Sequence, residues 1–302
     1  MRYWVGVTDN AWFDFLCREQ PDEVNFWQPS GRAPFVRLEP GALFLFKLKS
    51  PFNHIAGGGY LVKFSALPLS MAWDAFGTKN GAATFEKFAA MIRRLQRSDA
   101  AFDPVVGCTV LAQPFFFPRE EWIDLREVWP SNVVTGRYYD SDTDAGRAIW
   151  NAVHHRDSSA SVVAEPAERY GTPTLVRPRL GQGAFQVLVM DAYRRRCAIT
   201  GESTLPVLEA AHILPFSEAG PHEVGNGMLL RSDFHKLFDR GLITVTPSLD
   251  VEVSSIIHEQ WFNGRVYYDL HGRRLANIPE IAADRPDPQF LAWHNEHRFQ
   301  RG

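Results

Sequence analysis

Short apolar runs divide the first 150 residues into predicted strands and helices. Four of them are rich in aromatic or branched residues and bounded by turn residues, as strands are. They cover residues 2–7, 42–48, 60–64 and 107–113. In segments 70–76 and 84–97 the apolar residues recur at three- and four-residue steps, which is typical of helices. Residues 1–155 therefore predict a compact, β-rich α+β domain.

A different pattern begins near residue 155. Segment 156–174 is rich in Ser, Ala, Pro and Glu and has no sustained period, so we interpret it as a linker. Residues 183–196 then have helical spacing, and residues 207–213 form a predicted strand. A second short strand follows at 228–230, and Ser232 or Asp233 can cap a helix. The second domain, residues 175–302, therefore contains a small ββα unit.

Composition and charge narrow the class of protein. The chain has 302 residues, 45% hydrophobic and 22% charged, which fits two domains with apolar cores. Its formal net charge of -3 excludes a uniformly basic nucleic-acid coat but allows a local basic patch. Between residues 174 and 200 the chain carries Arg177, Arg179, Arg194, Arg195 and Arg196. These arginines are either a phosphate-facing patch or the solvated end of a helix.

The cysteines and the hydropathy pattern favour a cytoplasmic protein. Cys17, Cys108 and Cys197 are widely separated and have no metal-binding spacing, which indicates a reducing compartment. The first residues lack a basic segment followed by a long apolar run, so they do not predict a signal peptide. No window approaches the roughly 18 apolar residues of a membrane span. We therefore expect no membrane partner.

Two histidines and a carboxylate are predicted to meet in the ββα unit. The first strand ends at His212, and the helix carries His235 and Asp239 four residues apart on one face. A neutral imidazole can take a proton from water while a divalent cation stabilises the charge on a phosphate and its leaving oxygen. The grouping therefore suits metal-assisted hydrolysis of a phosphodiester.

Four linked signatures in this region resemble the HNH endonuclease family, also called ββα-metal nucleases, and especially its restriction-type branch. They are Cys197-Ala-Ile-Thr200-Gly201, Ala210-Ala211-His212-Ile213-Leu-Pro215, Asn226-Gly227-Met-Leu-Leu230 and His235-Lys-Leu-Phe238-Asp239-Arg-Gly241. The resemblance implies that His212 is the general base and His235 a metal ligand. It also implies that Asn226 braces the metal loop by hydrogen bonds.

Ala211 departs from the family pattern. Many relatives carry Asp or His there as another ligand, so we predict Asp239, one turn from His235, as the second ligand. Glu209 and Asp233 are weaker alternatives. So few imidazoles and carboxylates leave positions for water, which suits Mg²⁺, Mn²⁺ or a similar cation better than a closed zinc site. Outside the pattern, and predicted to be surface or packing residues, are His222, His258 and His271.

The first domain resembles the PUA superfamily, especially the EVE type, in which a strand-rich barrel holds a modified base. The similar segments are Tyr3-Trp4-Val-Gly, Val24-Asn-Phe-Trp27-Gln-Pro-Ser30 and Leu38-Glu-Pro-Gly41-Ala-Leu-Phe-Leu-Phe46. The resemblance implies a PUA-like β-barrel with helices. An aromatic side chain near a loop tip can stack on a flipped base while amides and hydroxyls read its edge. The predicted pocket residues are Asn25, Phe26, Trp27 and Ser30, and core packing is the alternative for the two aromatics.

Together the two resemblances predict an α+β endonuclease of restriction type. Its partner would be double-stranded DNA that carries modified bases, such as modified cytosine, read by the first domain. A homodimer would let two subunits meet and cut both strands. Two alternatives stay open: an HNH nuclease specific for an unmodified sequence, and a non-cleaving reader whose HNH site is degenerate because of Ala211.

Overall fold

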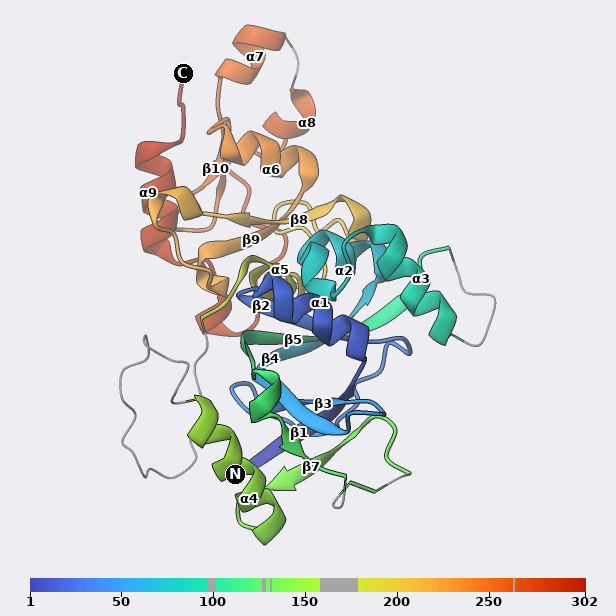
Figure 1. Ribbon diagram of the computed structural model, residues 1–302. Helices are drawn as coiled ribbons and strands as arrows, with labels where there is room; N and C mark the ends of the chain where they lie inside the picture. The colour runs from blue at the N-terminus through green and yellow to red at the C-terminus, as the bar shows by residue number, and fades with distance from the viewer. Residues whose placement is uncertain (97–101, 127–128, 131, 158–178, 263) are drawn as a thin grey trace. The chain divides into compact units, whose positions relative to one another are not determined.

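The computed structural model describes residues 1–96, 102–126, 129–130, 132–157, 179–262 and 264–302. The chain divides into two compact units, Met1–Ala184 and Phe185–Gly302, coloured blue to green and yellow to red (Figure 1). Arg177 and most of the predicted linker lie outside the described residues. None of the described helices is long and apolar enough to cross a membrane.

A seven-stranded mixed sheet forms the centre of the first unit. Its strands are β1 (Arg2–Thr8), β2 (Glu23–Gln28), β3 (Leu43–Leu48), β4 (His54–Pro68), β5 (Val105–Phe116), β6 (Ile123–Asp124) and β7 (Gly136–Asp140). The strand order is β2-β5-β4-β3-β1-β7, with β6 paired to β4. β1 runs parallel to β3, and the other pairs are antiparallel. The four strands predicted from the sequence fall in β1, β3, β4 and β5.

β4 begins at His54, well before the predicted strand, because a glycine run is part of it. A Cβ at Gly57 would overlap the carbonyl oxygen of Phe115 on β5. A Cβ at Gly58 would come within 2.7 Å of the carbonyl oxygen of Phe44 on β3. These glycines therefore let both neighbouring strands approach β4 closely.

The predicted β-barrel is wrong, since the described strands form an open sheet that ends at β2 and β7. β2 packs against the 3-10 turn Gly77–Asn80 instead of closing onto β7. Its Asn25 carboxamide donates to Asn80 Oδ1 at 2.8 Å, and the Trp27 indole N–H donates to the Asn80 carbonyl at 3.0 Å. At the other end, helix α4 (Asp144–Asp157) packs beside β7 (Figure 1). The unit is therefore a mixed α+β fold.

The other helices of this unit are α1 (Asn10–Glu19), α2 (Leu69–Phe76) and α3 (Phe85–Leu95). α2 and α3 confirm the two helices predicted from the sequence, and Thr84 caps α3 through its side chain. The sequence pattern does not predict α1. Its cap is Asp9, which accepts the backbone N–H groups of Ala11 and Trp12. α1 buries Trp12 and Phe13 in the aromatic core under the sheet.

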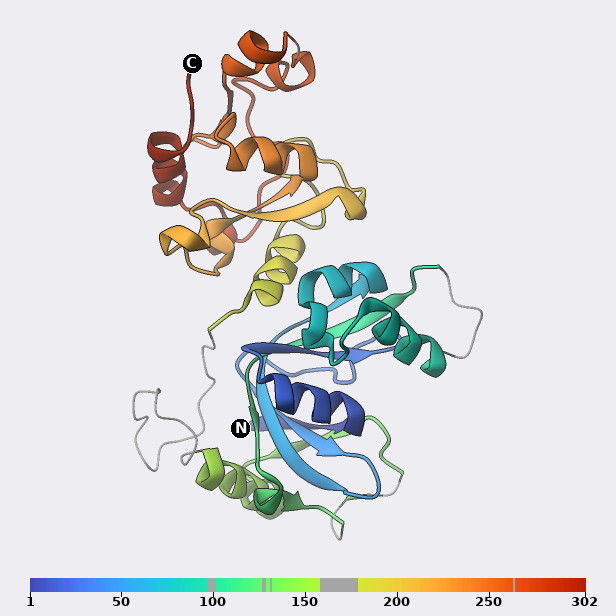
Figure 2. The ribbon, with the colours of Figure 1, turned by 45° about the horizontal axis from the view of Figure 1, so that its top comes forward.

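The second unit contains the predicted ββα arrangement. β8 (Leu208–His212) and β9 (Gly227–Arg231) form an antiparallel hairpin, and α6 (Ser232–Asp239) packs against it (Figure 2). Phe234 and Phe238 of α6 are fully buried, so the opposite helix face carries the polar side chains. The remaining elements are α5 (Gln182–Ala192), β10 (Ile243–Val245), β11 (Val251–Val253), α7 (Ile256–Trp261), α8 (Arg265–Tyr268) and α9 (Pro288–His297).

Candidate active site

His212 stands at the end of β8, opposite Gly227 of β9. Its half-buried imidazole stacks on the ring of Phe185, with centroids 3.9 Å apart and planes at 11°. A Cβ at Gly227 would meet that same Phe185 ring at 3.0 Å, so glycine there leaves room for the ring. The hairpin and α5 together fix the orientation of this histidine.

The pKa of His212 keeps its imidazole in the neutral form. Burial lowers this pKa to about 4, and positive charge on His222 and His235 acts in the same direction. An unperturbed histidine has a pKa of about 6.5. The His212 imidazole is therefore neutral at neutral pH, which is the form that can take a proton from water.

His222 lies against His212, although the sequence pattern assigned it a surface or packing role. Nδ1 of His222 is 3.0 Å from Nε2 of His212. The His222 ring also stacks on Phe216, with centroids 4.7 Å apart and planes at 7°. The one signal in the sequence is its position in the loop between the two motif strands, close to Asn226.

Asn226 is fully buried and ties that loop together. Its Oδ1 accepts the Leu214 backbone N–H at 2.8 Å. Its Nδ2 donates to the carbonyl oxygens of Leu214 at 2.9 Å and Pro221 at 3.0 Å. The three bonds satisfy the carboxamide internally, and they hold the chain on both sides of the loop, next to His212 and next to His222. Asn226 thus acts on the shape of the loop.

His235 projects from α6 between two carboxylates. Its Nδ1 is 2.6 Å from Oε2 of Glu209, and its Nε2 is 3.4 Å from Oδ2 of Asp239. A carboxylate on one ring nitrogen fixes the tautomer and orientation of an imidazole whose other nitrogen binds a metal. Glu209 fits that orienting position, while Nε2 and Asp239 face one another.

These groups fit a hydrated divalent cation better than a closed metal site. Among the described residues, no group of three or more His, Cys, Asp or Glu side chains is arranged to hold a metal ion. Mg²⁺ is commonly bound by one or two carboxylates and keeps several waters. His235 and Asp239 are the two side chains that would hold such an ion, with water at its other positions.

Ala211 and Asp233 have other environments. Ala211 is fully buried in the hairpin, so its side chain belongs to the core of the unit. The Asp233 carboxylate accepts two bonds from Arg231, at 2.7 and 2.8 Å, and one from Tyr267 at 3.3 Å. Asp233 therefore stabilises the start of α6, which leaves Asp239 as the carboxylate facing Nε2 of His235.

Residues 197–246 match the family model described as HNH endonuclease. This part of the chain is an HNH endonuclease domain. The matched segment covers β8, β9 and α6 and includes His212, Asn226 and His235. An HNH nuclease hydrolyses phosphodiester bonds, and nucleases of this family generally use divalent metal ions.

Several solved structures are distantly similar to the chain. The ASCH protein of Zymomonas mobilis has 11% identity and a TM-score of 0.35, over 49% of this chain and 94% of that chain. A mutant of the same protein has 10% identity and a TM-score of 0.35, over 50% and 97%. The modification-dependent TagI restriction endonuclease has 14% identity and a TM-score of 0.29, over 93% of this chain and 76% of that chain. No curated protein matches the chain.

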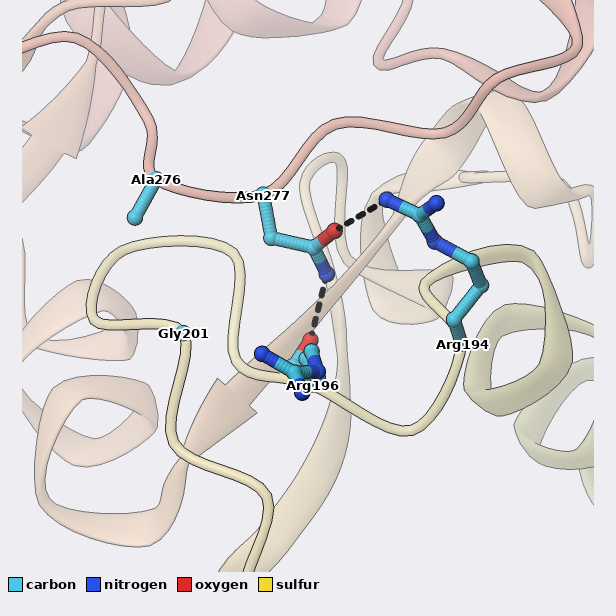
Figure 3. A pocket seen from close by; sticks show the side chains of 5 residues that line it. All are labelled: Arg194, Arg196, Gly201, Ala276 and Asn277. Atoms are coloured by element: carbon cyan, nitrogen blue, oxygen red, sulfur yellow. Dashed lines mark hydrogen bonds between the residues drawn. The ribbon is translucent and has the colours of Figure 1, made fainter.

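Two of the predicted phosphate-binding arginines line a pocket of about 380 Å³ in the unit that carries the HNH domain. The pocket is bounded by Arg194, Arg196, Gly201, Ala276 and Asn277 (Figure 3). The Asn277 carboxamide donates to the Arg196 carbonyl at 2.9 Å and accepts from Arg194 at 3.4 Å. Arg194 also contacts Glu280. Two arginines therefore line the pocket, and the Arg194 guanidinium is held by Asn277 and Glu280, whereas Arg196 is held through its backbone carbonyl.

The same arginines do not lie in a helix. α5 ends at Ala192 and has no basic residue in its last turn, whereas the sequence predicted a helix through Arg196. Arg194 and Arg195 have left-handed backbone conformations, with φ of 51° and 57°. Arg195 approaches Asp191 at 3.9 Å. In the first unit, Arg179 is exposed. Arg194, Arg195 and Arg196 therefore directly follow the C-terminal end of α5, and Arg194 and Arg196 are exposed.

The four residues predicted to form the base pocket have different environments in the first unit. They lie on or just after strand β2, which pairs with β5, and not at a loop tip. Phe26 and Trp27 line a pocket of about 170 Å³, which also involves Trp12, Asp9 and Lys49. Asn25 is fully buried and bonded to Asn80. Ser30 is exposed and is not part of the pocket wall.

Proposed function

We propose that this chain is a metal-dependent DNA endonuclease of restriction type that selects DNA carrying a modified base. The observation that supports it most is the HNH domain in which a neutral His212 and the pair His235–Asp239 project from one ββα unit. The preference for modified DNA is carried by the aromatic pocket of the first unit.

In the proposed reaction, His212 takes a proton from water as the water oxygen bonds to phosphorus. The bond from phosphorus to the leaving oxygen breaks, and that oxygen departs with the bonding electrons and is protonated by solvent. A divalent cation bound at His235 and Asp239 would stabilise the negative charge on the phosphate and on the leaving oxygen. Phe185 orients His212, the general base, and Asn226 holds the loop beside His212.

Incubation of the full chain with DNA, with Mg²⁺ or with a chelator, tests the nuclease proposal. We expect cleavage with Mg²⁺ and none with the chelator, while DNA binding is measurable in both. Binding without cleavage under all metal conditions would contradict the proposal and favour the alternative of a non-cleaving reader.

Arg194→Gln with Arg196→Gln is expected to weaken binding to every DNA sequence alike. Phosphate contacts release counterions, so each lost contact should reduce the slope of log affinity against log salt by about one unit. Arg265→Gln on α8 is a matched control, because Arg265 is exposed but lines neither pocket. Unchanged affinity and slope in the double variant would remove these arginines from the DNA interface.

The pocket in the first unit has the chemistry of a nucleobase site. Trp27 is the partly exposed aromatic side chain of this pocket and offers a π surface for stacking, whereas Trp12 and Phe26, which also line it, are buried in the core. Asp9 and Lys49 form an ion pair at 3.1 Å in the same wall and can hydrogen-bond the polar edge of a base. Extruding a base from the duplex costs free energy, and stacking and edge contacts in such a pocket offset that cost.

Trp27→Ala is expected to remove about 1–3 kcal/mol of binding to modified DNA, as other base–aromatic stacks do. Affinity for unmodified DNA should survive, because the phosphate contacts are unchanged, so discrimination between the two DNAs collapses. Trp27→Phe keeps a stacking surface and should retain most of the preference. Binding to both DNAs and thermal unfolding are measured on the same variants.

Phe26→Ala is the comparison for Trp27→Ala, because it shows the loss of stability expected when a core aromatic side chain is truncated. Phe26 is 5% exposed and packs on Phe44 in the core, so its truncation should cost about 3–5 kcal/mol of stability. If Trp27→Ala shows this same large loss of stability and keeps its preference for modified DNA, Trp27 is a core residue and the pocket assignment fails.

The pH profile of cleavage should reflect the low pKa of His212. The neutral imidazole is the active form, and its pKa lies at about 4. We therefore expect the rate to stay level from neutral pH down to about pH 5 and to fall below about pH 4. A decline centred near pH 6.5, with the protein still folded by circular dichroism, would show an unperturbed histidine.

A further inference from the structure

We propose that His222 is a positioning residue for His212: it accepts a hydrogen bond from Nε2–H of His212 and leaves Nδ1 of His212 free to take the proton from water. This inference rests on the proposed role of His212 as the general base. The observation that carries it is the 3.0 Å approach of His222 Nδ1 to His212 Nε2.

The two imidazoles lie in a stack of aromatic rings. Phe185 covers one face of His212, and Phe216 covers one face of His222, with ring planes at 11° and 7°. The two imidazole planes are tilted by 58°, which brings the edge nitrogens together. This packing comes from α5 on one side and from the β8–β9 loop on the other, so the hydrogen bond is fixed by two separate segments.

Asn226 holds the backbone that carries His222. Its Nδ2 donates to the carbonyl of Pro221, the residue before His222, and its Oδ1 accepts the N–H of Leu214. The backbone N–H of Ile213 donates to the Asn226 carbonyl at 2.9 Å. One buried asparagine therefore sets the distance between the end of β8 and His222.

The tautomer decides whether His212 can act as a base. When both imidazoles are neutral, the hydrogen bond between Nε2 of His212 and Nδ1 of His222 contains one proton, which either ring can donate. If His222 donated it, His212 would carry its own proton on Nδ1 and would have no free lone pair. If His212 donates, Nδ1 keeps its lone pair for water, and the bond strengthens when His212 becomes an imidazolium. A base oriented by a third group is a common arrangement in enzymes that activate a nucleophile.

The surroundings of His212 and His222 favour a hydrogen bond between the two rings over a metal ion bound by both. The groups that face the two imidazoles are Phe185 from α5 and Phe216 from the loop, with His235 of α6 as the further titratable group that acts on His212. In the described part of the chain, no carboxylate pairs with either ring and no metal-binding group of three side chains includes them. Two imidazoles alone are a poor site for Mg²⁺, which prefers oxygen ligands.

His222→Ala and His222→Asn test the proposal in the full chain. The Asn side chain can place an acceptor oxygen about where Nδ1 of His222 lies, whereas Ala cannot. For a metal-ligating histidine, loss of such an outer partner typically costs about 10–100-fold in activity. We expect His222→Ala to lower kcat by that factor with little change in KM, and His222→Asn to recover most of kcat. His258→Gln is the control, since His258 is exposed on α7.

Three kinetic results would overturn the proposal. The first is a wild-type kcat in His222→Ala, and the second is an equal loss in the Ala and Asn variants. The third is a higher Mg²⁺ requirement in His222→Ala, which would make the pair a cation site. Nitrogen-15 NMR of the His212 ring gives an independent readout: the Nε2–H tautomer supports the proposal, and the Nδ1–H tautomer contradicts it.

His212→Ala is measured in parallel to separate the role of His212 from the role of His222. If His212→Ala cleaves DNA like the wild type, the proposed function of His212 itself fails. If His212→Ala is inactive while His222→Ala keeps wild-type kcat, only the role of His222 fails.

Discussion

His212→Ala is expected to slow DNA cleavage by about 10²–10⁴-fold, which is the usual effect of losing a general base. DNA affinity should stay close to that of the wild type, because the substitution removes a proton acceptor and no guanidinium group. The half-buried ring stacks on Phe185, so thermal unfolding must accompany the assay. Single-turnover cleavage at saturating enzyme isolates the chemical step from binding.

His258→Ala is the matched control for this substitution, because His258 is exposed and its backbone N–H, not its ring, bonds Tyr268. It should cleave at the wild-type rate. A His212→Ala protein that is folded and cleaves within a factor of two of the wild type would exclude His212 from the mechanism.

His235→Ala is the second variant with a large expected effect. Cleavage should be lost at ordinary Mg²⁺ concentrations, and any residual activity should require more Mg²⁺ or Mn²⁺, because Nε2 of His235 would no longer bind the ion. Asp239→Asn should shift the metal requirement in the same direction. Its carboxylate lies 3.4 Å from Nε2 of His235 and is exposed, so the substitution should leave the core intact.

Asp233→Asn provides the contrast on the same helix. Its carboxylate is bonded to Arg231 and Tyr267, so we expect a change in stability and an unchanged metal requirement. Titration of cleavage rate against Mg²⁺ for the three variants checks the assignment. Full activity with a wild-type metal titration in His235→Ala would place His235 among the structural residues.

The ββα unit could be predicted closely from the sequence because its determinants are local. The strand ending at His212 and the helix carrying His235 follow from apolar spacing, and the loop 213–226 and β9 connect them. The predicted cap at Ser232 or Asp233 is wrong, because the N-cap of α6 is Arg231, which makes no side-chain cap bond. The ion pair of Asp233 with Arg231 and the approach of Glu209 to His235 depend on side-chain geometry across the hairpin. Spacing along the chain does not report such contacts.

The contact of His222 with His212 is another contact that spacing along the chain does not report. This contact exists because Asn226 draws Pro221 inward and Phe216 stacks on the His222 ring. Both are properties of a folded loop without regular periodicity. The motif that identifies His212 and His235 contains no position that requires His222, so the sequence offers only its place in the loop near Asn226, and the contact itself is visible only in the structure.

The first unit was harder to predict because its sheet depends on contacts between distant residues. β2 pairs with β5, so Phe26 and Trp27 are strand residues although the segment ends in a Pro-Ser turn. The predicted barrel fails because Asn80 and the turn before it pack on β2. A hydrogen bond between Asn25 and Asn80 gives no signal in the local hydrophobic pattern, so an open sheet and a closed barrel could not be told apart.

The most direct test of the central claim compares cleavage of one phage DNA in two forms, with and without modified cytosine. Both are incubated with the full chain and Mg²⁺, and the initial rates are measured at the same DNA concentration. We expect cleavage of the modified DNA and little or none of the unmodified DNA. Equal rates on the two forms would contradict selection of a modified base and would favour a nuclease that recognises an ordinary sequence.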